Sequence, residues 1–548
     1  MSESEREHYP RLKPERRRRA MSRTNFSDRR SYERYEGNFP VDIVTGLPGA
    51  EVVYHGIAHD ISSGGLLLEV TGIPESEKRF RVSFRLPKGV MPEEFIHSAV
   101  DVEADVSHRK ANGTMGIQFV EPLHRRLERT TWTYLKMAAV GFFILALCTV
   151  ILIKYQNFYI FWFDIPIFLY NILVGAYLIS RFLFAAFYRC PKPLDVLPTM
   201  TVIVPVFNEE KFIERTLRQV MESAYPVDKL NVIVVNDGST DKTPAAIERI
   251  RKVYPEIVLV NFAQSRGKRS ALAAGVRMAT TEVVTFIDSD SFLVPQALSY
   301  LVSSFRDPKV AAVTGHCDAE NIWTNLLTRM QAVRYFLSFR VLKAAESVFD
   351  SVTCLSGPIA AYRRDILMTL LDKWETQMFL GRPATFGDDR SLTNYLLELG
   401  HNVVYDKRAR VTTIIPDTYK SFLTQQMRWK RSWFRESLRA CTFMWKRQPL
   451  MSFSFYLGFL LPIVSPFIVF RAFVLLPIMG DLMPFNYLLG VFLMSSMMST
   501  VYLFAKRSRL WLYGIPFCFF YMAVLVWQLP LAMITCCKSG WGTRGAQV

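Results

Sequence analysis

Hydrophobic and polar positions follow three different patterns along this chain of 548 residues. Residues 25–125 contain short alternating runs separated by turn residues such as Ser62-Ser63-Gly64-Gly65, a pattern typical of a small antiparallel β-barrel. In residues 195–440, apolar strand-like runs alternate with helical stretches, which predicts a doubly wound α/β sheet. Residues 1–24 are charged and lack apolar periodicity, so we expect a disordered basic tail there.

Long, mostly uncharged apolar runs form the third pattern and predict membrane-spanning helices. Residues 131–190 contain two such runs, 137–153 and 165–187, which we expect to form two transmembrane helices. Residues 450–536 form a C-terminal transmembrane region, with runs at about 452–479, 483–505 and 510–535. Three C-terminal spans would place the tail 537–548 on the outer side of the membrane. Its motif Trp541-Gly-Thr-Arg544 is expected on the cytoplasmic side, so hydropathy leaves the number of spans open. No signal peptide precedes the polar N-terminus, which predicts that it stays cytoplasmic.

Composition narrows the classes of function. Hydrophobic residues make up 50% of the chain and charged residues 21%, which indicates soluble domains joined to membrane segments. The net charge of +17 fits nucleic acid, anionic lipid or a phosphorylated ligand, and part of it comes from the arginine-dense residues 11–34. The eight cysteines have no metal-ligand spacing. Neither a Gly-x-Gly-x-x-Gly fingerprint nor a P-loop follows the first α/β strand, which counts against dinucleotide oxidoreductases and P-loop ATPases.

Polar residues gather where the α/β strands are expected to end, the edge at which such sheets bind ligands. Asp288-x-Asp290 follows the apolar run 283–287 and presents two carboxylates, which suit one Mg²⁺ or Mn²⁺ ion bridging a diphosphate. Asp237 follows a neighbouring strand and is suited to bond a uracil or a ribose, and Lys268 is suited to bond the nucleotide. The first strand ends in a polar turn at Asn208 and Glu209, which we expect to contact the nucleotide sugar.

Two further motifs lie close together downstream. Gly387-Asp388-Asp389 supplies a carboxylate that can accept a proton, and Gln425-x-x-Arg428-Trp429 supplies a basic and aromatic cluster for a phosphorylated leaving group. The plain alternatives are a solvated acidic turn and a basic amphipathic surface helix over residues 422–438.

In this order, the motifs resemble the processive family-2 glycosyltransferases with a GT-A fold, which include the cellulose, chitin and hyaluronan synthases. Longer pieces, among them Gly387 to Asn394 and Trp541-Gly-Thr-Arg544, look closest to hyaluronan synthase. The resemblance implies that Asp389 is the general base beside Asp388, and that Asp288 and Asp290 hold the metal. It also implies that nucleotide-sugar contacts come from Gln425, Arg428, Trp429, Trp541 and Arg544.

The N-terminal region resembles the PilZ domain, which binds cyclic di-GMP. The resemblance rests on Arg30-x-x-x-Arg34, preceded by Arg29, and on Asp60-x-Ser62-x-x-Gly65. Arginines can clamp phosphates and stack on guanine, whereas an acid and a hydroxyl can bond the guanine edge. The plain alternative is a disordered basic segment beside an ordinary β-turn.

These features predict a multidomain membrane protein: a PilZ-type β-barrel, a GT-A glycosyltransferase domain and transmembrane helices. The expected function is processive, inverting polymerisation of an exopolysaccharide, hyaluronan-like from UDP-GlcNAc and UDP-GlcA, with export and activation by cyclic di-GMP. Alternatives are an N-acetylglucosamine chain, a β-glucan or mannuronan, a non-processive lipid glycosyltransferase, or a cyclic di-GMP receptor scaffold. Expected partners are the nucleotide sugar, the growing polysaccharide, the lipid bilayer and export-complex proteins, but not nucleic acid. We expect a multi-pass protein of the bacterial inner membrane with cytoplasmic PilZ and catalytic domains.

Overall fold

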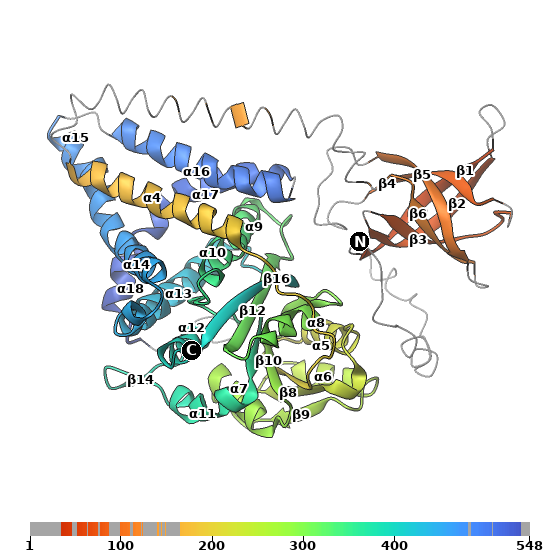
Figure 1. The fold of residues 1–548 in the computed structure, drawn as a ribbon, viewed down its shortest axis with the longest axis horizontal. Coiled ribbons are helices and arrows are strands. Elements are labelled where there is room, and N and C mark those ends of the chain that lie inside the picture. Colours follow the sequence, from red (N-terminus) through yellow and green to blue (C-terminus); the bar gives the residue numbers. More distant parts are fainter. Residues whose placement is uncertain are drawn as a thin grey trace. The chain divides into compact units, whose positions relative to one another are not determined.

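The computed structural model describes most of the chain beyond residue 164 and the strands before it (Figure 1). The described residues are 34–46, 52–62, 64–74, 77–86, 99–109, 113–121, 123, 137, 140, 141, 144, 148, 165–480, 484–506 and 508–538. The chain divides into two compact units, one of residues 1–141 with 504–509 and one of residues 142–503 with 510–548.

Six antiparallel strands close into a barrel in the first unit, in the order β1-β2-β3-β6-β5-β4. Buried and outward-facing side chains alternate along the strands, which gives the barrel an apolar interior. In β4, Phe80, Val82 and Phe84 are buried while their neighbours face outward. Gly65 begins β3, where a Cβ would lie 2.1 Å from the Ile117 carbonyl oxygen of β6, so the two strands approach closely. The strands are β1 (Arg34–Thr45), β2 (Val52–Ser62), β3 (Gly65–Val70), β4 (Arg79–Arg85), β5 (Ala99–Arg109) and β6 (Thr114–Phe119). The predicted antiparallel barrel is confirmed.

The second unit contains an eight-stranded sheet in the order β11-β16-β12-β13-β10-β7-β8-β9. Strands β10, β7, β8 and β9 form its parallel part, in which every residue of β7 and β10 is buried, as expected for strands covered on both faces. The other half is mixed, because β13 runs antiparallel to both β10 and β12. The strands are β7 (Met200–Val206), β8 (Leu230–Asn236), β9 (Val258–Asn261), β10 (Val283–Ile287), β11 (Ser291–Leu293), β12 (Val310–Ala319), β13 (Ile359–Arg363) and β16 (Asn402–Thr413).

Helices pack against this sheet (Figure 1), and two of them carry the motifs Asp388-Asp389 and Gln425-x-x-Arg428-Trp429. Helix α7 (Lys268–Met278) packs on β7 and β8, and α8 (Ala297–Leu301) packs on β16. Helix α12 (Asp388–Glu398) contacts α11 (Arg364–Glu375) and the long helix α13 (Tyr419–Ala440). The remaining helices of this part include α5 (Ile213–Met221), α6 (Thr243–Arg251), α9 (Leu326–Leu337) and α10 (Ala344–Ser347), and a small hairpin pairs β14 (Met378–Phe379) with β15 (Arg382–Pro383).

Three helices among the described residues are long and apolar enough to cross a membrane: Pro166–Phe187, Pro449–Ile478 and Tyr487–Lys506. A fourth span results if the bent pair Arg509–Leu525 and Gln528–Ile534, which meet at 47°, counts as one. The elements are α4 (Ile165–Phe187), α14 (Pro449–Phe470), η8 (Arg471–Leu475), α15 (Leu476–Ile478), α16 (Pro484–Lys506), η9 (Arg509–Tyr513), α17 (Gly514–Phe520), η10 (Tyr521–Leu525) and α18 (Gln528–Ile534). Almost all of the predicted span 137–153, and all of the tail 1–24, lie outside the described residues.

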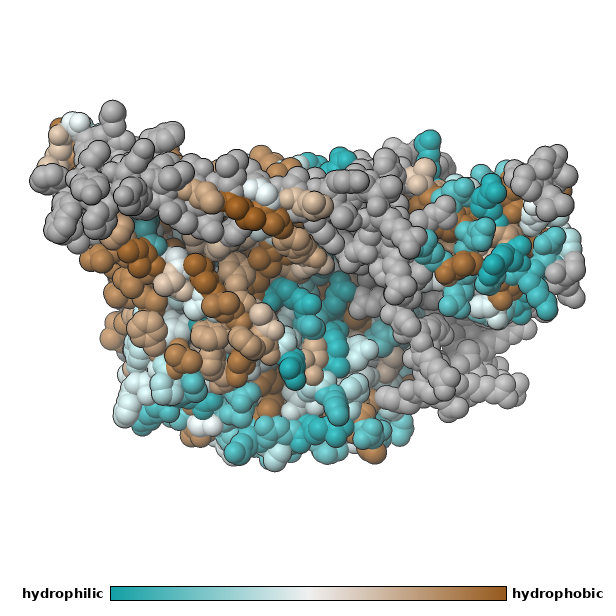
Figure 2. All heavy atoms as spheres, turned by 45° about the horizontal axis from the view of Figure 1, so that its top comes forward, coloured by the Kyte–Doolittle hydropathy of each residue, from teal (hydrophilic) through white to brown (hydrophobic). Residues whose placement is uncertain are grey.

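Several large apolar side chains on these helices are exposed. Leu183, Phe467 and Ile534 are 58%, 71% and 82% exposed, which is typical of lipid-facing positions rather than of a soluble surface. Figure 2 shows hydrophobic residues gathered over the apolar helices of this unit and hydrophilic residues over its sheet domain. Arg181 is a charged residue within α4: it is buried, and its guanidinium donates a hydrogen bond to the Ser454 hydroxyl of α14.

Candidate active site

The Gly387-Asp388-Asp389 motif forms the start of α12. Gly387 has φ +80°, and a Cβ there would lie 2.1 Å from Ser432 Oγ of α13, so glycine permits both the turn and the close approach of the two helices. Both aspartates occupy the first helical turn, where the helix dipole stabilises negative charge. The motif is thus a helix N-terminus, not a solvated acidic turn.

Asp388 is buried and is held by side chains of two other helices. Its Oδ1 lies 3.4 Å from Arg269 Nε of α7, and its backbone carbonyl accepts a hydrogen bond of 3.1 Å from Trp374 Nε1 of α11. Burial raises the pKa of Asp388, while Arg269 and Lys268 oppose that rise. These contacts hold Asp388 in one position at the start of α12.

Asp389 is half-buried and has a different set of partners. Its Oδ1 accepts a hydrogen bond of 2.8 Å from the Arg390 backbone N–H, and its Oδ2 lies 3.3 Å from the Cys354 thiol. Burial raises the pKa of Cys354 to about 11, and Asp389 adds to the rise, so the thiol stays protonated and can donate. Two donors thus orient the carboxylate of Asp389.

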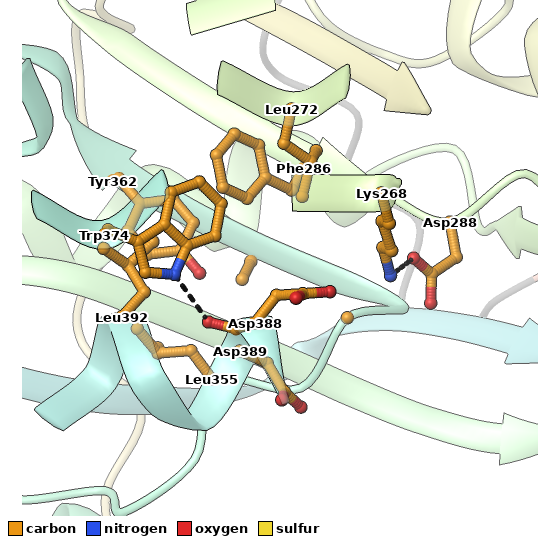
Figure 3. Close-up of a pocket in the computed structure, with 12 residues that line it drawn as sticks. Lys268, Leu272, Phe286, Asp288, Leu355, Tyr362, Trp374, Asp388, Asp389 and Leu392 are labelled. Carbon is orange, nitrogen blue, oxygen red and sulfur yellow. Dashed lines mark hydrogen bonds and ion pairs between the residues drawn. The ribbon is translucent and has the colours of Figure 1, made fainter. Parts of the chain in front are cut away.

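Asp288 and Lys268 form an ion pair across the site from α12, as Figure 3 shows. Lys268 is the first residue of α7, and its Nζ lies 2.5 Å from Asp288 Oδ1 at the end of β10. Burial lowers the pKa of Lys268, but Asp288, followed by Asp388 and Asp389, outweighs burial and raises it. The Asp290 carboxylate lies 3.4 Å from Thr413 Oγ1 of β16.

A hollow that is open to solvent lies between the ion pair and the two aspartates of α12 (Figure 3). Its lining combines apolar side chains with Lys268 and three carboxylates: Lys268, Leu272, Phe286, Asp288, Leu355, Gly357, Ala360, Tyr362, Trp374, Asp388, Asp389 and Leu392. No group of three or more His, Cys, Asp or Glu side chains within the described residues is arranged to hold a metal ion. Two carboxylates completed by phosphate and water oxygens remain a suitable donor set for Mg²⁺.

Asp237 organises the loop that precedes α7. It is buried, and its carboxylate accepts hydrogen bonds from Ser265 Oγ at 2.7 Å, the Arg266 N–H at 2.7 Å and the Gly267 N–H at 3.0 Å. This carboxylate therefore fixes the backbone that presents Lys268. A direct contact between Asp237 and a base or ribose stays a prediction.

Asn208 and Glu209 lie in the loop after β7 and form hydrogen bonds with the segment after β8. Asn208 has φ +52°, and its Oδ1 accepts a hydrogen bond of 2.8 Å from the Thr240 N–H. The Glu209 N–H donates to Thr243 Oγ1 at 2.8 Å. Both residues thus lie at the predicted ligand-binding edge of the sheet.

The Gln-x-x-Arg-Trp motif lies on α13. Burial lowers the pKa of Arg428, and Asp388, Asp288 and Asp389 oppose this, which places its guanidinium in the field of all three carboxylates. Trp429 is 37% exposed, with its ring 6.2 Å from that of Tyr335. Within the described chain, Gln425 Oε1 is buried without a hydrogen-bond partner.

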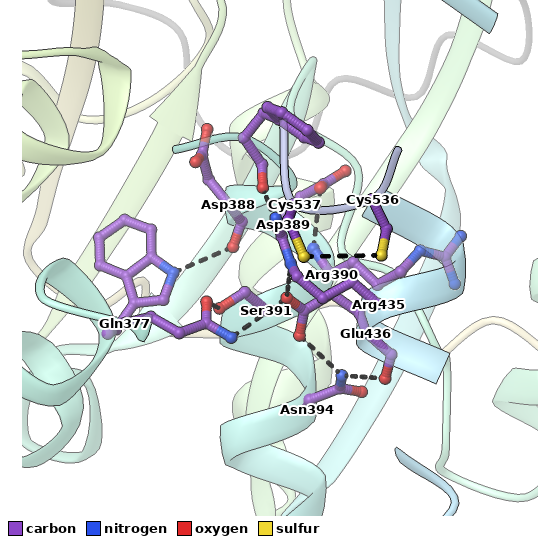
Figure 4. A network of polar contacts seen from close by, with 12 residues as sticks. Gln377, Asp388, Asp389, Arg390, Ser391, Asn394, Arg435, Glu436, Cys536 and Cys537 are labelled. Carbon is purple, nitrogen blue, oxygen red and sulfur yellow. Dashed lines mark hydrogen bonds and ion pairs between the residues drawn. The ribbon is translucent and has the colours of Figure 1, made fainter. Parts of the chain in front are cut away.

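A buried polar network that the sequence did not predict joins α12 to α13 (Figure 4). The Glu436 carboxylate accepts hydrogen bonds from Arg435 Nε at 3.0 Å, Gln377 Nε2 at 3.1 Å and Asn394 Nδ2 at 3.2 Å. Gln377 Oε1 in turn accepts a hydrogen bond of 3.1 Å from Arg269 Nη1. Arg435 and Glu436 follow the Gln-x-x-Arg-Trp motif on α13, but nothing in their spacing distinguishes a buried pair from a solvated one.

The predicted cyclic di-GMP residues are only partly described. Asp60 Oδ1 accepts a hydrogen bond of 3.1 Å from the Leu67 N–H, and Ser62 Oγ donates to the Gly65 carbonyl at 3.1 Å, so they form the junction of β2 and β3. Arg34 begins β1, but its side chain lies outside the described residues. Also outside them lie Arg29, Arg30, Trp541 and Arg544.

Comparison with known proteins assigns both units. The family Glycosyl transferase family 2 matches residues 201–371, and the PilZ domain matches residues 28–136. An N-acetylglucosaminyltransferase of Rhizobium meliloti (strain 1021) is 37% identical over 295 residues, covering 52% of this chain and 68% of that protein. A hyaluronan synthase of Streptococcus pyogenes serotype M3 is 33% identical over 300 residues, covering 53% and 70%. The solved mannosyltransferase PcManGT from Pyrobaculum calidifontis, in complex with GDP-Man and Mn²⁺, has a TM-score of 0.46 and 22% identity, covering 69% of this chain and all of that chain.

The sheet, the barrel, the two family matches and the two relatives define a glycosyltransferase with a GT-A-like fold and a PilZ domain. The chain belongs to glycosyl transferase family 2. The predicted fold class, family and enzyme class are thereby confirmed.

Proposed function

We propose that this protein is a membrane-embedded, processive, inverting β-glycosyltransferase that polymerises an exopolysaccharide from nucleotide sugars and exports it. The observation that carries the proposal is one hollow whose lining includes Asp389 of α12 together with the Lys268–Asp288 pair. A proton acceptor and a site for a diphosphate thus line one space, and direct displacement at an anomeric carbon requires both groups close to the reacting atoms.

In this mechanism Asp389 accepts the proton of the acceptor hydroxyl as that oxygen attacks the anomeric carbon. The Arg390 N–H and the Cys354 thiol hold the carboxylate in position. The bond to the nucleoside diphosphate breaks on the opposite side, where Arg428 and Lys268 stabilise the negative charge that develops on the leaving group. A divalent cation, when bound to Asp288 and Asp290, supplies further charge neutralisation there.

The remaining predicted contacts complete this assignment. Asp237 orders the loop before Lys268 and, with Asn208 and Glu209, lies at the strand ends suited to the nucleoside. Trp429 offers a partly exposed ring for stacking on the acceptor sugar, beside Gln425. Trp541 and Arg544 are assigned to closing the site from the tail.

Contacts between α13 and the apolar helices support coupling of synthesis to export. Lys430 Nζ donates to the Leu525 carbonyl at 2.5 Å and to Gln528 Oε1 at 3.1 Å, at the break between η10 and α18. Burial, with a smaller effect of Arg334, lowers the pKa of Lys430 to about 7. The helix that carries Trp429 is thus attached to the last, bent helix pair. We assign the protein to the bacterial inner membrane, with both soluble domains cytoplasmic.

Two polymers fit the relatives. Hyaluronan requires UDP-GlcNAc and UDP-GlcA, as the likeness to hyaluronan synthase suggests. A chain of N-acetylglucosamine alone is the second candidate, favoured by the 37% identity to an N-acetylglucosaminyltransferase. Radiolabelled UDP-sugars, offered singly and in pairs to the purified protein, distinguish the two when the product is digested with hyaluronan lyase or chitinase. Absence of incorporation from any nucleotide sugar would leave the receptor scaffold as the better assignment.

The PilZ domain is proposed to make this activity depend on cyclic di-GMP. Arg34→Ala is expected to abolish the stimulation by cyclic di-GMP and to leave basal sugar transfer unchanged, because one phosphate clamp is lost. Sugar transfer is measured with and without the dinucleotide. Arg85→Ala, an exposed arginine on β4 of the same barrel, is the matched control and should keep full stimulation. If Arg34→Ala also keeps full stimulation, this arginine has no role in activation.

A further inference from the structure

Lys268 already occupies the position of a cation on Asp288, a proposed metal ligand. The ammonium lies 2.5 Å from Asp288 Oδ1, and both side chains are about a quarter exposed, at 25% and 27%. Gly357 leaves room over the pair: a Cβ there would lie 2.9 Å from Asp288 Oδ2 and 3.1 Å from Lys268 Nζ. Figure 3 shows the pair at the edge of the hollow, with Lys268 reaching across from α7.

The other carboxylates of the hollow have partners of their own. Asp388 is paired with Arg269, and Asp389 accepts hydrogen bonds from the Arg390 N–H and the Cys354 thiol. A divalent cation that binds Asp288 must therefore displace the Lys268 ammonium. The displaced ammonium then lies in a half-buried space whose other carboxylates, Asp388 and Asp389, already have partners. An unpaired ammonium in such a place is unfavourable, and a diphosphate supplies the missing anionic oxygens.

We propose that Lys268 exchanges partners when the site loads: its ammonium leaves Asp288 for the diphosphate as the divalent cation takes Asp288. The exchange rests on the proposed function, because it takes the hollow as the nucleotide site. Its consequence is that the cation and the nucleoside diphosphate bind cooperatively, each weakly alone. Such coupling is reciprocal and typically amounts to roughly 5–150-fold in affinity.

Mn²⁺ binding to the purified full-length protein, followed by electron paramagnetic resonance with and without UDP, tests the exchange. The wild-type protein should bind Mn²⁺ alone weakly and at least about tenfold more tightly with saturating UDP, beyond the affinity of Mn²⁺ for free UDP. Lys268→Met should bind Mn²⁺ alone about tenfold more tightly than the wild type, because the competing ammonium is gone. Lys268→Arg retains a cation and should behave as the wild type.

A gain in Mn²⁺ affinity is informative because structural damage would weaken binding. Lys343→Met is the matched control: Lys343 is also buried near the site, but its ammonium bonds the Cys354 carbonyl and, at 2.8 Å, Ser356 Oγ. Its Mn²⁺ affinity should stay within about twofold of the wild type. Lys268→Met with unchanged or weaker Mn²⁺ binding would overturn the exchange, as would a wild-type protein whose Mn²⁺ affinity is indifferent to UDP. Both results concern Mn²⁺ binding and not sugar transfer, so the proposed function is tested separately by sugar incorporation.

Discussion

Asp389→Asn is expected to lower the rate of sugar transfer by about 10²–10⁴-fold, the usual contribution of a general base. The substitution keeps the shape of the side chain and its place in the first turn of α12 but removes the group that accepts the hydroxyl proton. The affinity for UDP should change little, because the Asp389 carboxylate contacts the Arg390 N–H and the Cys354 thiol, whereas Lys268 pairs with Asp288. The loss should therefore appear in kcat rather than in nucleotide binding.

The measurement is initial-rate sugar incorporation, with UDP affinity determined on the same preparation. Asp372→Asn is the matched control, since Asp372 is an acid on α11 whose side chain is 90% exposed. It should leave the rate within about twofold. Near-normal transfer by Asp389→Asn would exclude Asp389 as the base and direct attention to Asp388.

Arg428→Ala is expected to lower kcat/KM by about 10²–10³-fold, the loss typical of removing one preorganised donor to a developing charge. Burial lowers the pKa of Arg428, yet the carboxylates of Asp388, Asp288 and Asp389 oppose this and keep the guanidinium charged. Removing the guanidinium deprives the leaving diphosphate of a cation. It also removes positive charge that offsets the negative charge of those three carboxylates. Arg428→Lys should recover only part of the loss, because an ammonium lacks the fork of a guanidinium.

Kinetics with varied nucleotide sugar test this expectation. Lys420→Ala is the control, because Lys420 is an exposed cation in the first turn of the same helix. Arg428→Ala with the wild-type kcat/KM would show that the site stabilises the leaving group without this residue.

The chain pattern predicts the parallel half of the sheet because β7, β8 and β10 are nearly continuous apolar runs. It does not predict β13, whose sequence Ile-Ala-Ala-Tyr-Arg is short and carries little pattern. The antiparallel placement of β13 between β10 and β12 depends on tertiary packing, which periodicity does not encode.

The site follows a similar division. Spacing and residue type identify Asp288, Asp389 and Arg428 as candidates, since carboxylates and a guanidinium of these motifs have direct chemical uses. The partners that hold them, such as Cys354 and Glu436, come from other elements and carry no motif of their own. Hydropathy likewise predicts an apolar run at 510–535 but not the 47° bend within it.

The size of the product at low substrate conversion tests the central claim most directly. The purified full-length protein is supplied with UDP-GlcNAc, alone and with UDP-GlcA, and the product is sized after less than about a tenth of the substrate has reacted. A processive polymerase yields long chains beside unreacted substrate from the earliest times. Single-sugar products, or short chains that lengthen only as conversion proceeds, would contradict polymerisation by a chain held at the site.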